Sequence, residues 1–492
     1  MLTTVSDEFM RHIAGDSYRQ ATTISVLPDN ILLEIFCLHK ENDGTPYYLP
    51  WDWHLIVQVC RRWREVVFAS PHSLDLRIVC TSRTPAGKNL AIWPTLPIFI
   101  DFGYYSDRRH GNNASSEDNI LTALKHVDRV CDVRLRPTGS ELERISTVMQ
   151  QPFPVLTSLH IISGGLNVPV LPAEFLGGSA PRLRNIYMRR IPFPALPTLL
   201  LSTSDLVTLH LENIPPTGYI STEAMIVGLA VLPRLTHFVI HFQSASPRSD
   251  RIQPPPAIRT ILPALTFFQF QGASEYLEDL VYRIDAPQLN RILIRYLNQL
   301  IDFQVAQLSM FMDRSVGPKL TSFRHARVTF YSHLVTFRTY GHANDSSPET
   351  HHAITTVLCQ GMAWHVSHMA RVFSHFSTTL SNVVHLKLEL KEDRKLEGTD
   401  EVEWIHLLHQ FPTVQTLNVS HDLSGHVALA LENIARGTVT EVLPSLDLVY
   451  LAGQPASSIE KFVSARRLSD CSVTVVETQT EFNEKLKSYV SK

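Results

Sequence analysis

The chain of 492 residues is 44% hydrophobic and 18% charged, with a formal net charge of −3. This length exceeds what one compact core holds and suggests roughly three domains. The near-neutral charge excludes a polybasic nucleic-acid-binding protein, and the apolar fraction excludes a disordered acidic chain. Prolines number 30 and glycines only 20, so we expect the prolines to stand at defined positions of a folded chain.

The sequence shows neither a targeting signal nor a disulfide framework. The first 21 residues carry five charged side chains, and the longest uncharged run, residues 145–173, is interrupted by four prolines. Neither segment has the character of a secretory signal or a membrane helix. The six cysteines include no CxxC pair, which argues against a zinc site or a disulfide framework. We expect no membrane association and a cytoplasmic or nuclear location.

The first apolar segment predicts a helix. Pro28 is well placed at its start, where the missing N–H of proline costs nothing. Two pairs of apolar residues then lie four positions apart, Ile31 with Ile35 and Leu32 with Phe36. This spacing gives the helix a broad apolar face over about three turns.

A second helical segment follows a polar loop at residues 41–50. Helical spacing returns in residues 53–69, with Asp52 as a candidate N-cap and a break expected near residues 60–61. Short helices of this kind are marginal as an isolated fold and leave many large apolar side chains to cover. A partner surface is therefore expected.

Two sequence blocks in this region are more specific than amphipathic spacing alone. They read LPDNILLEIF at residues 27–36 and VCRRWR at residues 59–64. In this order, with a long loop between them, the blocks resemble the F-box domain, a three-helix module. Residues 76–101 are similar to the linker and first strand of F-box proteins of mushroom-forming fungi.

The resemblance implies docking onto the Skp-type adaptor of an SCF ubiquitin ligase, and through the adaptor onto a cullin. The positions that match the family's motif, and that it implies for adaptor binding, are Leu27, Pro28, Ile31, Leu32, Ile35, Phe36, Val59, Cys60 and Trp63. A three-helix module also needs a core, so not all of them can face outward. The alternative is an amphipathic helix pair that produces the same pattern without binding an adaptor.

A pattern of apolar residues at first, fourth and sixth positions recurs every 23 to 32 residues, apart from one gap of 63. The copies begin at Val130, Leu156, Leu183, Leu206, Leu235, Leu265, Leu289, Leu320, Val383, Val414 and Leu446, and the weaker copy at Leu320 ends on His325. In eight of these eleven copies a proline lies two residues before the first position. Proline cannot extend a preceding helix and needs no ladder donor at a strand start, so the pattern predicts one strand per repeat. The long gap is close to two periods, which indicates a degraded or replaced copy.

The segments between these strands predict helices, because apolar residues share a face. Three such sets are Leu142/Ile145/Val148, Leu277/Leu280/Val281/Ile284 and Val427/Leu431/Ile434. A strand and a helix at this period, with L-x-x-L-x-L on the strand, are typical of the leucine-rich repeat. We therefore expect an α/β chain, in which an irregular leucine-rich-repeat solenoid with a parallel inner sheet follows the all-α module. Residues 327–340 alternate instead and predict an inserted β-hairpin.

The residues between the apolar anchors vary freely, as on a binding surface carried by a constant scaffold. Aromatic and arginine side chains dominate protein contacts. The candidate target-binding residues are therefore Tyr187, His210, His237, Phe267, Arg291, Arg324, Lys387 and Tyr450. For each of them alone, the competing interpretation is a strand face that simply has to be polar.

Metal binding, enzymatic catalysis and nucleic-acid binding have weaker support in the sequence. Five histidines lie between residues 351 and 375, and three of them would share a face if this segment formed one helix. Apart from Cys359, no carboxylate or cysteine lies at ligand spacing, so we expect no metal and no cofactor. Hydrolase, P-loop and dinucleotide motifs are missing and paired arginines are isolated, so we expect neither an enzyme nor a nucleic-acid-binding protein.

The predicted organisation is a flexible tail at residues 1–23, an F-box at 24–78, a linker at 79–125 with a first strand at 93–102, and repeats at 126–492. The predicted function is a non-catalytic substrate receptor of an SCF-type ubiquitin ligase, whose repeats bind an unknown protein target. The alternative is a leucine-rich-repeat interaction scaffold outside a ubiquitin ligase.

Overall fold

The computed structural model describes residues 24–42, 53–83, 85–103, 115–165, 167–244, 259–297, 305–315, 324–331, 334–340, 352–358, 363–391, 401–435 and 441–490. The chain is α/β with a large, mostly parallel sheet. It divides into two compact units, which are Met1–Asp101 with Asn112–Ala123, and Phe102–Gly111 with Leu124–Lys492.

The smaller unit begins with short helices and continues into a pair of parallel strands. In chain order its elements are η1 (Ile24–Val26), α2 (Asp29–Asn42), α3 (Trp53–Val57), α4 (Arg61–Ala69), β1 (Ile78–Thr81), α5 (Ala86–Ile92), β2 (Ile98–Phe102) and α6 (Ser115–Leu124). The predicted helices and the break between them are confirmed, and the strand expected at residues 93–102 corresponds to β2, which is the second strand of the unit. The strand β1 and the helix α5 form where the sequence predicted only a linker, and Asp52 lies outside the described residues.

Trp53 forms the centre of this unit's core. Its side chain is only 1% exposed, and its indole Nε1 donates a hydrogen bond of 2.9 Å to the carbonyl oxygen of Arg77. The ring meets Phe68 and Trp93 edge-on, with centroids 5.8 and 5.2 Å away. Edge-on packing suits the charge distribution of aromatic rings. One side chain therefore joins α3 to α4 and to the chain after α5.

The helix α2 is tied to α4 by one ring contact and one arginine. Phe36 is buried and meets the ring of Trp63 at 5.0 Å. Arg62 pairs with Asp29 at the first turn of α2, Nη2 to Oδ1 at 2.6 Å, and also donates to the carbonyl oxygen of Leu27. Arg62 therefore holds the start of α2 against α4. In this way a residue of the second sequence block, VCRRWR, is joined to the first block, LPDNILLEIF.

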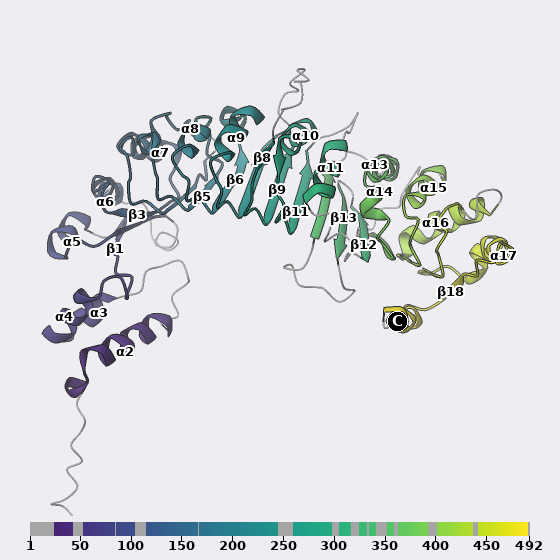
Figure 1. Ribbon diagram of the computed structural model, residues 1–492, viewed down its shortest axis with the longest axis horizontal. Helices are drawn as coiled ribbons and strands as arrows, with labels where there is room; N and C mark the ends of the chain where they lie inside the picture. Colours follow the sequence, from purple (N-terminus) through teal and green to yellow (C-terminus); the bar gives the residue numbers. More distant parts are fainter. Residues whose placement is uncertain are drawn as a thin grey trace, which may run out of the picture. The chain divides into compact units, whose positions relative to one another are not determined.

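The first half of the larger unit alternates strands with helices. Its elements are β3 (Val130–Leu135), α7 (Gly139–Val148), β4 (Ser158–Ile162), η2 (Phe175–Gly178), β5 (Asn185–Arg189), α8 (Leu196–Leu200), β6 (Thr208–Ile214), η3 (Pro216–Gly218), α9 (Thr222–Leu229), β7 (His237–Phe242), β8 (Thr260–Ile261), β9 (Phe267–Gly272), α10 (Ser274–Arg283), β10 (Ile284–Asp285), β11 (Arg291–Tyr296) and α11 (Ala306–Ser315). The strands β4, β5, β6, β7, β9 and β11 stand side by side in this order. Helices α7 to α10 lie on one side of them (Figure 1). The strands β8 and β10 form a small separate pair.

The second half continues in the same way after a local change of order. Its elements are β12 (His325–Phe330), β13 (Leu334–Tyr340), β14 (His352–Leu358), α13 (Ala363–Ser374), α14 (Ser377–Leu380), β15 (His385–Leu390), α15 (Glu401–His409), β16 (Thr416–Val419), α16 (His421–Ile434), β17 (Leu448–Leu451), η4 (Ala456–Ile459), α17 (Glu460–Leu468), β18 (Thr474–Val476) and α18 (Gln479–Val490). The helices predicted from shared apolar faces appear as α7, α10 and α16.

The predicted repeat strands are confirmed, and their backbones are joined just before each strand begins. The N–H of Thr157 donates to the carbonyl oxygen of Cys131, that of Arg184 to Thr157, and that of Val207 to Arg184, each at 2.8 Å. Such bonds fix the register between neighbouring repeats before the apolar anchors pack. Every second side chain of β4, β5 and β6 is then buried on the helix side.

The weak repeat at Leu320 is where the structure departs from the predicted pattern. β12 pairs in parallel with β15 but not with β11, because β13 and β14 lie between them in the order β11-β14-β13-β12-β15. β12 and β13 are antiparallel, as the predicted hairpin requires. Leu320, the first anchor of this copy, lies outside the described residues. His325 is buried, but its ring stacks on those of Tyr340 and His385 in the neighbouring strands, on the opposite side of β12 from Ala326 and Val328. The hairpin and β14 therefore fill the long gap in the repeat spacing.

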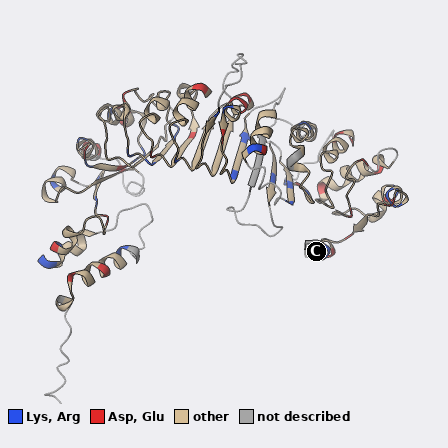
Figure 2. Cartoon of the chain, in the orientation of Figure 1, with Lys and Arg blue, Asp and Glu red and all other residues tan. Residues whose placement is uncertain are grey.

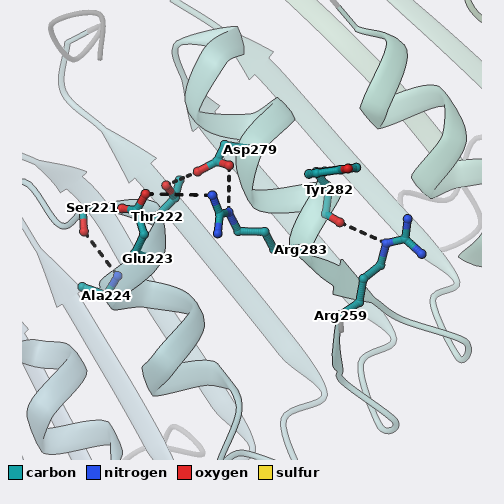
Figure 3. Close-up of polar contacts among 8 residues, drawn as sticks. All are labelled: Ser221, Thr222, Glu223, Ala224, Arg259, Asp279, Tyr282 and Arg283. Carbon is teal, nitrogen blue, oxygen red and sulfur yellow. Dashed lines mark hydrogen bonds and ion pairs between the residues drawn. The ribbon is translucent and has the colours of Figure 1, made fainter. Parts of the chain in front are cut away.

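The helix layer is joined by a polar network between α9 and α10 (Figure 3). Thr222 donates its hydroxyl to Asp279, and the Nε of Arg283 donates to the same carboxylate at 2.8 Å. Glu223 lies 4.0 Å from the Arg283 guanidinium, and Ser221 caps the first turn of α9. Because the arginine side chain is only 12% exposed, its charge needs these partners. The network sets the spacing of two neighbouring repeats.

Candidate functional site

An apolar stripe runs along the outside of α2. Ile31, Ile35 and Leu38 lie four and three positions apart, which places them on one side of the helix. They are 36%, 37% and 53% exposed. We call these three residues the α2 stripe. Near the end of α3, Leu55 and Val59 are also exposed. Burying a side chain of this size contributes about 1.5–3 kcal/mol, so the stripe suits contact with another protein.

The residues predicted for adaptor binding fall into three groups. Pro28, Ile31, Ile35, Val59 and Cys60 are exposed, Leu27 and Trp63 are half-buried, and Leu32 and Phe36 are buried. For the last two the structure corrects the prediction, because they form the core of the smaller unit. Cys60 caps α4, its Sγ accepting from the N–H of Trp63 at 3.5 Å. The predicted set omitted Leu38, which a spacing of seven from Ile31 would have identified.

A second candidate surface is the side of the large sheet away from the helices, which we call the open face. Side chains on it follow the strand register, so His160 lies beside Tyr187, and Tyr187 beside His210. Six of the residues predicted for target binding belong to it: Tyr187, His210, His237, Phe267, Arg291 and Lys387. Arg324 is exposed just before β12. The register therefore places these six side chains on one side of the sheet, and their role in target binding stays a prediction.

Polar and aromatic side chains gather at the first half of the open face. The ring of Tyr187 lies 4.1 Å from that of His160 and 4.5 Å from that of His210. Glu212 accepts hydrogen bonds from Tyr187 at 2.9 Å and from the Nε2 of His210 at 2.8 Å. We call these four residues, with His241 beside them, the histidine cluster. The sequence did not indicate Glu212, which joins two candidate residues of neighbouring strands.

The charges of the histidine cluster are set by burial. Burial lowers the pKa of His160 to about 4, with the charge of Arg134 acting in the same direction. Burial also lowers the pKa of His241 to about 4, although Glu212 opposes this. Burial raises the pKa of Glu212, but the hydrogen bonds from Tyr187 and His210 outweigh it and leave the pKa lowered. At pH 7 the cluster therefore contains a carboxylate and at least two neutral imidazoles.

These shifts predict that the protein loses stability in mild acid. Between pH 6.5 and 4 these histidines bind protons in the unfolded chain, whereas His160 and His241 of the folded chain do not. The free energy of unfolding therefore decreases as the pH is lowered through this range. We expect about 1 kcal/mol per histidine on going from pH 7 to 5, after allowance for partial exposure. Urea unfolding at both pH values measures this. The double variant His160→Gln/His241→Gln should show a clearly smaller pH effect, and an equal effect would contradict the assignment.

Lysine and arginine positions gather on strands farther along the sheet (Figure 2). The register places Arg338 of β13 opposite Arg327 of β12, and Arg327 opposite Lys387 of β15. We call these three residues the cationic row. Glu389 lies beside it, 2.5 Å from the Nζ of Lys387 and 3.9 Å from the Nε of Arg327. Burial raises the pKa of Glu389, but the hydrogen bond and charge of Lys387 outweigh this and lower it.

The end of the open face is covered by the C-terminal helix. Tyr450 of β17 is 7% exposed, and its ring lies 5.6 Å from that of Phe482 in α18. Leu448 and Val476 are buried in the same cluster. The structure therefore corrects the prediction that Tyr450 contacts a target, because α18 occupies that position. Strand alternation alone could not reveal a helix that crosses to the other face.

The structure gives no support for metal chemistry within the residues it describes. No group of three or more histidine, cysteine or acidic side chains there could hold a metal ion. The histidine-rich segment is not one helix, because it divides into β14 and α13.

No described helix combines the length and apolar character needed to cross a membrane. Neither the scan against protein-family models nor the search of curated proteins found a match to this chain.

Proposed function

We propose that the protein is a non-catalytic substrate receptor of an SCF-type ubiquitin ligase. In this proposal the smaller unit docks onto a Skp-type adaptor, and the open face binds a target protein. The observation that carries it is the α2 stripe, because the LPDNILLEIF block forms a helix that exposes Ile31 and Ile35 while burying Leu32 and Phe36 in its own core. The block therefore supplies both the residues that pack the helix into the module and an exposed apolar surface for a partner.

Two further features support this function. Arg62 of the VCRRWR block holds α4 against the start of α2, so the two blocks that resemble the F-box form one packed module. The larger unit carries aromatic and charged side chains on a regular sheet, as an irregular leucine-rich-repeat receptor would. The role of such a receptor is proximity, since it raises the effective concentration of a target lysine near the conjugating enzyme.

The double variant Ile31→Asp/Ile35→Asp tests adaptor docking. Each substitution places a charge in a contact that should be apolar, so we expect at least about 2 kcal/mol of lost binding energy, or roughly a thirtyfold higher Kd. Binding of the full chain to a purified Skp-type adaptor would be measured by biolayer interferometry. The control is Ile92→Asp on α5, which is 71% exposed and lies outside both blocks. Equal affinities for all three proteins would overturn the proposed docking.

The competing function is an interaction scaffold outside a ubiquitin ligase. The same open face favours it, because binding to a target does not require an adaptor. Co-purification separates the two functions: a receptor brings down both adaptor and cullin, and its depletion stabilises a bound target. A scaffold brings down the target without the cullin.

A further inference from the structure

The cationic row is an arrangement that a strand pair normally avoids. Arg327 has a like charge directly opposite on both neighbouring strands, Arg338 on one side and Lys387 on the other. Like charges in this position destabilise a sheet. Arg338 is exposed and has no carboxylate partner among the described residues. Glu389 pairs with Lys387 and Arg327, and its carboxylate also interacts with the charge of Lys391. The row therefore holds more positive charge than its own strands neutralise.

Two more cations extend this charge across the sheet. Arg291 and Arg295 point to the open face of β11. The residues that alternate with them, Ile292 and Ile294, are buried on the other side of the strand. Arg291 lies over the ring of Phe267 at 5.3 Å, and its buried Nε has no hydrogen-bond partner among the residues that the structure describes. Among the described side chains of β11, β13, β12 and β15 on this face, five cations therefore stand against Glu389 alone.

The spacing of these cations indicates the shape of the ligand. From β11 to β15 there are four steps between neighbouring strands, which is about 19 Å at the usual separation. An extended peptide covers that distance with about six residues. Singly charged groups distributed along such a segment can reach both the cationic row and the arginines of β11. One compact phosphate group would reach only one of these two places.

We propose that the open face between β11 and β15 binds an extended segment of the target that is rich in aspartate and glutamate. As an assignment of target chemistry it rests on the proposed receptor function. The carboxylates of the segment pair with the cationic row and with Arg291 and Arg295, whose guanidinium groups have the planar fork that carboxylates accept. The neighbouring ring of Phe267 supplies an apolar contact for a side chain between the charges.

Peptide binding to the full chain tests the assignment. The probe is a fluorescein-labelled decapeptide with glutamate at every second position, and its matched control has glutamine there. We expect at least tenfold tighter binding of the glutamate peptide by fluorescence anisotropy, with affinity falling as salt rises. The double variant Arg338→Gln/Lys387→Gln should lose about tenfold. Arg371→Gln, which removes an exposed cation from helix α13, should bind as the wild type does.

A thermal melt separates loss of binding from loss of folding. Removing Arg338 relieves a like-charge pair, so Arg338→Gln should melt no lower than the wild type while binding the peptide less tightly. Equal binding of both peptides, or an unchanged affinity of the double variant, would overturn the proposal. Tighter binding of a singly phosphorylated peptide or of a single-stranded oligonucleotide would also overturn it. No adaptor is present in these measurements, so they can fail or succeed independently of the proposed docking.

Discussion

Trp53→Ala should destabilise the smaller unit by about 3–5 kcal/mol, which is the usual cost of deleting a large buried aromatic side chain. The indole is 1% exposed and contacts Phe68 and Trp93, so little else can move in to fill the space. Truncation also leaves the carbonyl oxygen of Arg77 without its donor. A unit of this size has only a few kcal/mol of stability to lose, so we expect it to unfold at physiological temperature.

Hydrogen–deuterium exchange of the full chain would locate the effect. Protection should disappear from α2, α3 and α4 and remain in β4 to β9, because the two units are separately compact. Trp53→Phe keeps an aromatic ring but removes the N–H donor, and should cost only about 1 kcal/mol. Preserved protection in the α2 helix of Trp53→Ala would show that this tryptophan is not the centre of the unit. Loss of protection throughout both units would show instead that they fold as one.

Local spacing predicted the helical module well but could not decide which side of α2 faces outward. Ile31 with Ile35 and Leu32 with Phe36 have the same spacing of four residues, and only packing against α4 distinguishes them. The ring of Phe36 meets Trp63, while Ile31 and Ile35 remain exposed. That choice depends on contacts between residues nearly thirty positions apart in the sequence, which no periodicity within one helix records.

The repeat strands were also predictable from spacing along the chain. The prediction was wrong where a strand does not pair with the strand of the preceding repeat. Each regular strand pairs with the strand of the preceding repeat, so one pattern repeated along the chain describes both the strand and its neighbour. β12 pairs instead with β13 and β15, and β14 returns to β11. The weak copy placed an anchor at His325, which is buried against Tyr340 and His385, whereas Ala326, Val328 and Phe330 are buried on the other side of the strand. The covering of Tyr450 by α18 likewise depends on a contact that the repeat does not encode.

Phe268→Ala should destabilise the larger unit by about 3–5 kcal/mol, and the damage should extend to its neighbours. Phe268 of β9 is fully buried, its ring stacks on that of Phe238 at 5.5 Å, and it meets Phe311 of α11 at 6.4 Å. It therefore lies in the core between two successive strands and one helix. In a repeat array each unit is stabilised mainly by its neighbours, so a cavity at one junction weakens both sides of it.

The matched control is Gln269→Ala, one position along the same strand and on the open face. It removes a partly exposed polar side chain, so we expect the free energy of unfolding in urea to change by no more than about 0.5 kcal/mol.

Hydrogen-exchange measurements should show that Phe268→Ala lowers protection in β7, β9 and β11 more than in β3 or β17. A uniform loss would mean that the array unfolds as a single cooperative block. In that case the open face would be either completely folded or completely lost. A graded loss would mean that the face can be weakened at one end while the cationic row stays formed, because β12 and β15 make their register contacts on the far side of β14.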